Sequence, residues 1–257
     1  MKNRRRIAGL HAAESALRNA PERIVNVWVD ERRDDQRVAE LLTQLAGFGI
    51  SWQPASRNRL DVMAEGQNHQ GIVMEVTLSQ ELGEDELKDA LLKCQAPALY
   101  LALDQVQDPH NLGACLRTAD AAGVMGLIVP RDQSASITPT VAKVASGAAE
   151  TVPMYRVTNL VRALTLCKEQ GLWVAGAAGE SARSLHETDL SMPLVLVVGA
   201  EGKGLRRLTR EHCDFLIKIP MLGQVESLNL SVATGILLYE AVRQRSSSGR
   251  SPLPGTG

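Results

Sequence analysis

Apolar residues in the first part of the chain alternate between helical and extended spacing. The stretches AAESALRNA and VAELLTQLAG repeat apolar positions at helical intervals and predict helices, the second ended by a glycine. The stretches IVNVWVD and HQGIVMEV have the pattern of strands. Residues 1–76 are therefore predicted to form a small N-terminal α/β domain.

From residue 98 onward, short apolar runs alternate with helical stretches. The runs are LYLALD, GLIVP, MYRV, LWVAGAA, LVLVVGA and FLIKIP. Continuous apolar runs of this length are typical of strands covered on both faces, which predicts a mostly parallel sheet with crossover helices. A long apolar helix, LNLSVATGILLYEAVRQR, follows the last run. We expect a second α/β domain over residues 98–246.

Composition changes between and after these regions. Residues 77–97, TLSQELGEDELKDALLKCQAP, are acidic and end in a proline, which predicts a partly helical linker. Residues 247–257 are rich in Ser, Gly and Pro and are predicted to be a disordered tail. The chain is thus expected to have two domains, a linker and a tail.

Composition and charge narrow the classes of partner. The 257 residues carry a formal net charge of −1, so a nucleic acid would have to be held by local basic patches. Aromatic residues make up only 3% of the chain, which disfavours a platform of stacked bases. The four cysteines are widely spaced, as in a reduced cytosolic protein, and no apolar run is long enough for a membrane span. We expect a cytoplasmic protein.

The stretch HNLGACLRTADAAG, residues 110–123, carries the first candidate chemistry. A single His beside an Asp is no metal-ligand set, and Cys115 lies on an apolar helical face, where packing is the better interpretation. The spacings of a phosphate loop and of a dinucleotide fold are missing. What remains is a polar loop at a strand end, where ligands bind. Taken alone, Asn111 could simply cap a helix opening at Leu112, and Arg117 could be a solvated side chain.

Two further stretches favour a functional site. VVGAEGKGL, residues 197–205, places Glu201 between glycines after a buried strand. IPMLGQVESLNLSVATGILLYEA, residues 219–241, carries Ser227 and Asn229 where the last helix starts, although Ser227 could be an ordinary helix cap. Three blocks at three strand ends, each with one or two polar groups, predict one composite site.

These three blocks resemble the motifs of the SpoU family of S-adenosylmethionine-dependent RNA ribose 2′-O-methyltransferases, in the SPOUT superfamily. The likeness extends over nearly the whole chain through GLHAAESAL, HQGI, VTNL and LTREHCD. These stretches are similar to the branch that methylates a guanosine in the peptidyl-transferase region of large-subunit (23S) ribosomal RNA. The resemblance implies a catalytic domain with a C-terminal trefoil knot, a homodimer, and an N-terminal domain that binds RNA.

The resemblance also implies the roles of individual residues. The catalytic residues it implies are Asn111, Arg117, Glu201, Ser227 and Asn229, and the cofactor-binding residues are Gly199, Ile219 and Leu228. A guanidinium stays protonated in proteins, so we expect Arg117 to fix an RNA phosphate and stabilise developing alkoxide charge, oriented by Glu201. Ser227 and Asn229 would hold the ribose edge or the pocket wall. The expected cofactor is S-adenosylmethionine, with no metal ion.

Arginines and a lysine in two stretches are candidates for contact with ribosomal RNA. They are Lys2, Arg4, Arg5, Arg6, Arg32, Arg33, Arg57 and Arg59 in the N-terminal domain, and Arg206, Arg207 and Arg210 after the second block. Acidic neighbours leave a mixed solvated surface as the alternative. The alternatives for function are a transfer-RNA methyltransferase of the same family, an RNA-binding assembly factor without catalysis, and a dinucleotide-dependent oxidoreductase.

Overall fold

The computed structural model divides the chain into two compact units, Met1–Gln80 and Glu81–Gly257. It describes residues 4–33, 35–77, 82–94 and 97–247. The predictions made for Lys2 and for the tail beyond Ser247 therefore lie outside the described residues. Each unit is described by itself.

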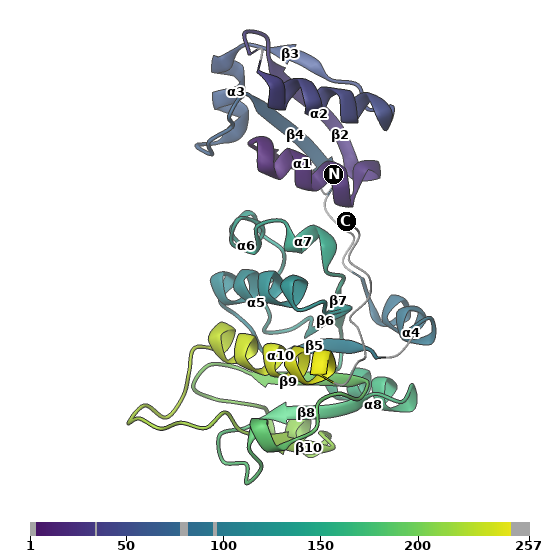
Figure 1. The fold of residues 1–257 in the computed structure, drawn as a ribbon, viewed down its shortest axis with the longest axis vertical. Helices are drawn as coiled ribbons and strands as arrows, with labels where there is room; N and C mark the ends of the chain where they lie inside the picture. Colours follow the sequence, from purple (N-terminus) through teal and green to yellow (C-terminus); the bar gives the residue numbers. More distant parts are fainter. Residues whose placement is uncertain (1–3, 34, 78–81, 95–96, 248–257) are drawn as a thin grey trace. The chain divides into compact units, whose positions relative to one another are not determined.

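A four-stranded sheet forms the centre of the first unit (Figure 1). Its elements are β1 (Arg4–Ala8), α1 (Leu10–Asn19), the short 3-10 helix η1 (Pro21–Arg23), β2 (Ile24–Asp30), α2 (Gln36–Gly47), β3 (Gln53–Ala55), α3 (Arg57–Ala64) and β4 (Ile72–Thr77). The strand order is β1-β4-β2-β3, in which β4 is antiparallel to both neighbours and β2 is parallel to β3. The predicted helices and strands of this region are confirmed.

Helices cover both faces of this sheet. On one face α1 and α2 bury Leu10 and Leu41 against the sheet residue Met74. On the other face α3 buries Leu60 against Trp28, which belongs to β2. Burying a leucine side chain in this way contributes about 2 kcal/mol to folding. This small unit therefore has apolar cores of its own.

The second unit contains the predicted parallel sheet. Its elements are α4 (Glu84–Leu92), β5 (Leu99–Asp104), α5 (Pro109–Ala121), β6 (Gly126–Pro130), α6 (Pro139–Ala145), α7 (Ala148–Thr151), β7 (Met154–Val157), α8 (Leu160–Glu169), β8 (Trp173–Ala177), the 3-10 helix η2 (Leu185–Glu187), β9 (Leu194–Gly199), α9 (Arg207–Glu211), β10 (Phe215–Ile217) and α10 (Leu230–Ser247). The strand order is β10-β8-β9-β5-β6-β7, and each adjacent pair is parallel. The trefoil knot stays a prediction.

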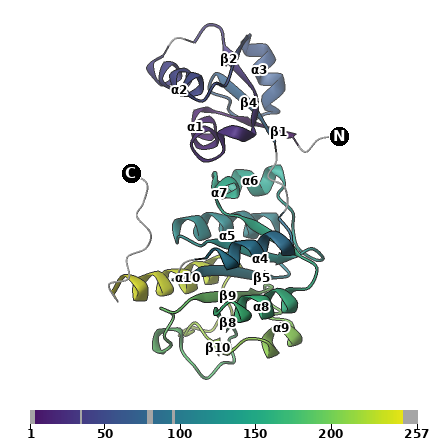
Figure 2. The ribbon, with the colours of Figure 1, turned by 90° about the vertical axis from the view of Figure 1, so that its right-hand side faces the viewer.

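Two helical layers enclose this sheet. Side chains of α5, α6, α7 and α10 fill the core on one face, and those of α4 and α8 fill the core on the other. Figure 1 and Figure 2 show α5 and α10 lying side by side in the first of these layers. No helix in the described part of the chain is long and apolar enough to cross a membrane.

Helix α4 lies within the stretch for which the sequence predicts a linker. Its Leu87 and Leu91 are 0% and 3% exposed and pack into the core that also contains β5 and α8. The division between the units falls at residue 80. Residues 84–92 are therefore part of the second unit, because an amphipathic helix with buried leucines is held by the sheet it covers.

The end of α10 is bound to the sheet by one arginine. The guanidinium of Arg245 donates hydrogen bonds to the backbone carbonyls of Pro97, Ala98, Leu190 and Met192, over 2.7 to 3.4 Å. Arg245 is 8% exposed, so these bonds satisfy a charged group that would be costly to bury alone. The last helix is thereby fixed to the chain entering β5 and to the chain entering β9.

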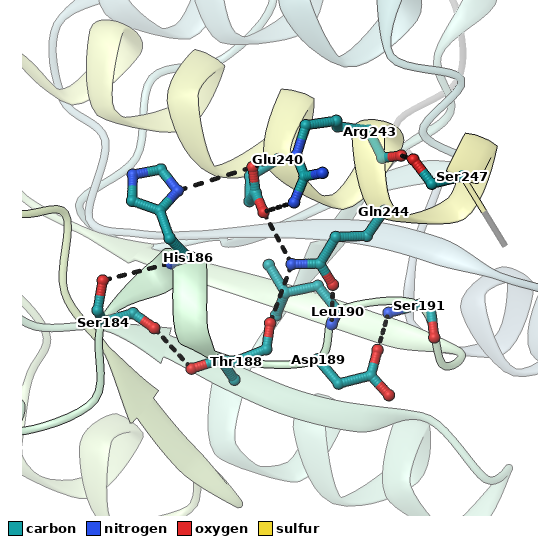
Figure 3. Close-up of polar contacts among 10 residues, drawn as sticks. All are labelled: Ser184, His186, Thr188, Asp189, Leu190, Ser191, Glu240, Arg243, Gln244 and Ser247. Carbon is teal, nitrogen blue, oxygen red and sulfur yellow. Dashed lines mark hydrogen bonds and ion pairs between the residues drawn. The ribbon is translucent and has the colours of Figure 1, made fainter.

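One turn earlier on α10, Glu240 accepts several hydrogen bonds (Figure 3). Arg243 donates to its two carboxylate oxygens over 2.9 and 2.7 Å, and Gln244 donates over 2.8 Å. His186 Nδ1 lies 3.8 Å from the same carboxylate. The Arg243 hydrogen bonds are the main cause that lowers the pKa of Glu240 to about 2, against burial, which raises it.

Acid should therefore weaken this part of the fold. Because the folded pKa lies below the ordinary carboxyl value of 4.5, the ionised Glu240 stabilises the fold above that value and loses its contribution as the pH falls toward 2. At pH 7, Glu240→Gln should lower the free energy of unfolding by about 3 kcal/mol. Urea unfolding at pH 7 and pH 3 measures both values, and the difference should shrink at pH 3. Glu211→Gln, at an exposed ion pair with Arg207, should cost under about 1 kcal/mol.

Candidate active site

Three segments meet at the carboxyl edge of the parallel sheet. Strands β5 and β9 are neighbours, and Asp104 at the end of β5 lies opposite Gly199 at the end of β9. Helix α5 follows β5, a short loop follows β9, and residues 218–229 lead from β10 to α10. Because all these strands are parallel, their carboxyl ends share one edge, where open α/β sheets bind ligands.

Helix α5 begins earlier than the sequence predicts. Its first residue is Pro109 rather than Leu112, and the side chain of Asp108 caps it by accepting from the His110 N–H over 3.0 Å. Proline at the first helical position is favourable because that N–H has no helical partner. Asn111 is therefore not a helix cap but a buried residue of the first turn, 9% exposed.

Side chains from all three segments are joined through Asn111. Asn229 Nδ2 donates to Asn111 Oδ1 over 3.0 Å. Asn111 Nδ2 in turn donates to Glu201 Oε2 over 3.4 Å, a long hydrogen bond. We call these three residues the Asn–Asn–Glu chain. Residues of all three blocks therefore meet at this edge of the sheet, and their role as one composite site stays a prediction.

Asn229, and not Ser227, caps the last helix. Asn229 Oδ1 accepts from the backbone N–H groups of Ser231 and Val232 over 2.9 and 3.4 Å, the usual geometry of a capping asparagine. Ser227 is exposed and forms no hydrogen bond with any described residue. One amide thus fixes the start of α10 with its oxygen and reaches Asn111 with its nitrogen.

The structure does not place Arg117 in this chain. Arg117 is exposed and makes no hydrogen bond or ion pair with the described residues, so the expected pairing with Glu201 is absent. Arg117 lies six positions after Asn111, which turns it about 240° around the helix from Asn111. Its guanidinium is therefore available to a group from outside this unit, and Glu201 interacts with Asn111 instead.

The structure also bears on the two other chemistries weighed for α5, a thiol nucleophile and a metal site. Cys115 is fully buried beside Thr234, and burial raises the pKa of its thiol to about 12. A thiol with so high a pKa is a poor nucleophile, which confirms the interpretation of Cys115 as a packing residue. Within the described residues, no group of three or more His, Cys, Asp or Glu side chains is placed to hold a metal ion.

The loop after β9 owes its glycines to its own tight turn. Ala200 and Gly204 exchange two backbone hydrogen bonds, of 3.1 and 2.8 Å, and Gly204 has a φ of 65°. A Cβ added at Gly199 would lie 2.1 Å from the carbonyl carbon of Gly204. The structure thus explains the glycine at 199 by contact with its own loop, whereas the sequence suggested close approach of a ligand.

Gly199→Ala should therefore destabilise the fold itself. The added methyl group would meet backbone atoms of Gly204 and Leu205, which cannot rotate away as a side chain can, so we expect a loss of about 3 kcal/mol in the free energy of unfolding. Gly179→Ala is the matched control, because nothing lies within 4 Å of its added Cβ, and it should change stability by under about 1 kcal/mol. Urea unfolding of both variants measures this. Parent-like stability of Gly199→Ala would mean that residues 204–205 move aside easily.

The other two candidate cofactor residues lie on the last connecting segment. Ile219 and Leu228 are both half-buried, and Ile219 packs against the core under α5 and α10. Half-buried apolar side chains beside loop backbone are the usual wall of a cofactor pocket. Their contact with a cofactor stays a prediction.

Asp104 is a site residue that the sequence analysis missed. Its side chain is fully buried and accepts from Arg206 twice, from the backbone N–H over 3.0 Å and from Nε over 2.7 Å. These bonds fix the chain where it leaves the Glu201 loop, and they give Arg206 a structural role besides any contact with RNA. The signal was an acidic residue ending the otherwise apolar strand LYLALD, because a buried carboxylate needs a partner.

Comparison with known protein families shows which domain contains each of these residues. Residues 98–239 match the SpoU rRNA Methylase family, and residues 6–82 match a domain described as RNA 2′-O ribose methyltransferase substrate binding. The chain belongs to the SpoU rRNA methylase family. The Asn–Asn–Glu chain and the Glu201 loop thus lie in the SpoU methylase region, and the first unit corresponds to the substrate-binding region.

Known proteins and solved structures are similar to this chain over most of its length. The chain is 54% identical over 247 residues to the 23S rRNA (guanosine-2′-O-)-methyltransferase RlmB of Shewanella oneidensis, covering 96% of this chain and 100% of that protein. An S-adenosylmethionine-bound rRNA methyltransferase from Sinorhizobium meliloti has a TM-score of 0.77 at 26% identity, over 94% of this chain and 87% of that one. A SpoU tRNA-modifying enzyme of A. aeolicus has a TM-score of 0.56 at 36% identity, over 67% of this chain and 88% of that one.

Proposed function

We propose that this protein transfers a methyl group from S-adenosylmethionine to the ribose 2′-hydroxyl of a guanosine in 23S rRNA, in the peptidyl-transferase region. The observation that carries the proposal is 54% identity, over 96% of this chain, to an enzyme named as a 23S rRNA (guanosine-2′-O-)-methyltransferase. The site at the sheet edge supports it, because residues of all three SpoU blocks are hydrogen-bonded there. We expect the reaction to take place in the cytoplasm, where the widely spaced cysteines would stay reduced.

Each site residue has a task that follows from its surroundings. The Asn–Asn–Glu chain holds three segments in one arrangement, so it positions the site before RNA arrives. Arg117 is exposed and uncommitted within the described residues, and its planar fork suits an RNA phosphate and the charge that develops on the ribose oxygen. Ser227, also exposed, offers a hydroxyl to the ribose edge.

The types of residue at the sheet edge are suited to binding S-adenosylmethionine. S-adenosylmethionine, when bound, supplies the methyl group on its sulfonium centre. Ile219 and Leu228 would hold its apolar parts, and the backbone at Gly199 would contact it from the loop after β9. Alignment of the hydroxyl with that methyl group, and removal of one proton, are the tasks left to the protein.

Three other functions are weighed against this one. A transfer-RNA methyltransferase would share the catalytic region, but the tRNA-modifying relative covers 67% of this chain. An assembly factor without catalysis would have no need of the Asn–Asn–Glu chain. An oxidoreductase is the weakest alternative, because the phosphate-binding glycine pattern of dinucleotide folds does not follow LYLALD.

Mapping of 2′-O-methyl groups tests the proposal directly. Ribosomal and transfer RNA from cells with and without the gene should differ by one methyl group, on a guanosine of 23S rRNA. The purified protein should bind S-adenosylmethionine in excess chelator, as followed by titration calorimetry. Loss of a transfer-RNA methyl group would favour the alternative enzyme, and unchanged RNA would favour the assembly factor.

We propose further that the protein works as a homodimer that packs through α10. Val232, Ile236 and Tyr239 are 50%, 36% and 52% exposed, and their spacing puts them on one face of that helix. An exposed apolar stripe of this kind is typical of an interface between subunits. The stripe follows directly on Asn229, so the interface would adjoin the site.

A charge placed on this stripe should separate the subunits. Ile236→Glu should reduce the mass measured by light scattering to that of one chain, because burying an unpaired carboxylate opposes association. Val62→Glu is the control, since Val62 is 78% exposed on α3 in the other unit, and it should leave the mass unchanged. A parent protein with the mass of one chain at micromolar concentration would contradict the dimer.

A further inference from the structure

Loops of the first unit gather at one edge of its sheet, and no residue in them is assigned to catalysis. Strands β2 and β3 are parallel and end together, with Asp30 opposite Ala55. Strand β4 is antiparallel to β2 and begins beside its end, with Ile72 opposite Val29. The loops that follow β2 and β3 and the loop that precedes β4 therefore lie side by side.

These loops enclose a cleft of about 550 Å³, lined by residues near 30–33, 56–58 and 68–71. We call it the arginine cleft, because Arg32, Arg33 and Arg57 all line it. Its volume lies in the range of clefts that hold small ligands of drug or cofactor size. A single nucleotide is a ligand of this size, whereas a base-paired helix is much too wide.

The charge of the cleft favours an anion. The side chains of Arg32 and Arg57 form no hydrogen bond or ion pair with any described residue, whereas Arg33 pairs with Asp35. Asp30 is the only acidic residue among the described lining residues, and its carboxylate accepts from the Arg32 backbone N–H over 3.0 Å. Two exposed guanidinium groups without a partner among the described residues therefore lie at one small site. Such a pair is suited to binding a phosphate group.

The floor of the cleft is held rigid by its own contacts. His69 is 6% exposed, accepts from the Gly71 N–H at Nδ1 over 2.9 Å, and lies 3.0 Å from Asp61 Oδ1 through Nε2. Arg33 crosses directly over Gly71, where an added Cβ would come within 2.6 Å of Arg33 Cδ. A cleft whose shape is fixed in advance loses less entropy when it binds a ligand.

Side-chain amides supply neutral hydrogen-bonding groups beside the arginines. Asn58, Asn68 and Gln70 line the cleft. Asn68 Oδ1 and Gln70 Oε1 accept from backbone N–H groups, each over 3.3 Å, which leaves their NH₂ groups as donors. Asn58 is exposed and makes no hydrogen bond with the described residues. Amides of this kind recognise the edges of unpaired bases in RNA.

We infer that the arginine cleft binds one unpaired nucleotide of the RNA substrate, with its phosphate on Arg32 and Arg57 and its base edge on the amides. The inference rests on the proposed function for the identity of the substrate. It assigns to the first unit a defined contact point for RNA, made of residues other than those of the methyl-transfer site. RNA segments with an unpaired base would be selected over continuous duplex.

The test compares two double variants of the full chain on 23S rRNA transcribed in vitro. Arg32→Gln/Arg57→Gln should raise the Kd for the transcript at least about tenfold, and should reduce the slope of log affinity against log salt by about 0.7, the value for one neutralised phosphate of a single strand. The maximal methylation rate at saturating RNA and the S-adenosylmethionine affinity should stay within about twofold of the parent. Both arginines are exposed, so the fold should be unaffected.

Arg18→Gln/Arg37→Gln is the matched control, because it removes the same charge from residues of α1 and α2 outside the cleft. Equal effects of the two double variants would overturn the inference and leave only a general charge effect. Asn58→Ala should raise the Kd about tenfold without changing the slope of log affinity against log salt. A Kd equal to that of the parent would overturn base recognition, because the cleft would then bind phosphate alone.

The same assays distinguish a failure of the proposed function from a failure of the arginine cleft. A parent protein that methylates the transcript and binds it as tightly as Arg32→Gln/Arg57→Gln refutes the cleft alone. A parent protein that binds the transcript through the cleft without methylating it refutes the proposed reaction alone. A parent that does not bind the transcript at all overturns both the substrate and the cleft.

Discussion

Arg117→Ala is expected to lower single-turnover methylation of 23S rRNA by about a hundredfold or more and to leave the affinity for S-adenosylmethionine within about twofold of the parent. The side chain is exposed and has no partner among the described residues, so its removal should not disturb the fold. The loss should fall on the chemical step, because the guanidinium acts on charge that develops there. Rapid quenching at saturating RNA measures the rate, and calorimetry measures the affinity.

Related variants separate this role from a general loss of charge. Arg117→Lys should recover little activity, because an ammonium group lacks the planar fork. Glu201→Gln and Arg117→Ala should have additive effects on the activation free energy, because the structure shows no contact between them, whereas Glu201→Gln and Asn111→Ala should not. Near-normal turnover by a folded Arg117→Ala protein would make Arg117 an ordinary surface residue.

Removal of the first unit should strongly reduce methylation of 23S rRNA and spare cofactor binding. A protein of residues 81–257 keeps the sheet, the Asn–Asn–Glu chain and the Glu201 loop, so its affinity for S-adenosylmethionine should match that of the full chain. It loses the matched substrate-binding region of residues 6–82 apart from two residues, so its kcat/KM for the transcript should fall by about a hundredfold or more. Calorimetry and initial rates measure the two quantities.

The starting residue of this shorter protein matters. A chain that starts at residue 97 would lack Leu87 and Leu91, whose removal from a core costs about 2 to 5 kcal/mol each. It should therefore unfold more easily than residues 81–257, which serves as the control for folding. Full activity of residues 81–257 on the transcript would show that the first unit does not select the RNA.

Most of the elements could be predicted from the sequence because their signals are local. The run LVLVVG is apolar throughout, which happens only where both faces of a strand are covered, and it forms β9 at the centre of the sheet. The start of α5 could not be placed as well, because the pattern begins at Leu112 while the cap Asp108 and Pro109 lie before it. The strand order depends on contacts between distant residues and has no local signal.

The candidate site was predicted in part for the same reason. Asn111, Glu201 and Asn229 could be brought to one edge by reasoning from parallel strands, and the structure joins them. Which residue pairs with Glu201 depends on which side chains of α5 face the loop after β9. The sequence placed the start of α5 three residues late, so it could not predict which side chains these are. Asp104 and Arg206 are 102 residues apart, so their pairing needed the folded chain.

The separation of contacting residues along the chain also sets the order in which the enzyme recovers after denaturation. Asn111 and Asn229 are 118 residues apart, and Arg245 and Pro97 are 148 apart. Contacts this distant form slowly, because a long loop must close before they stabilise anything. Local helices form far sooner. On refolding, helical content should therefore return first and methyl transfer should lag behind it, since the active site is completed only when α10 docks.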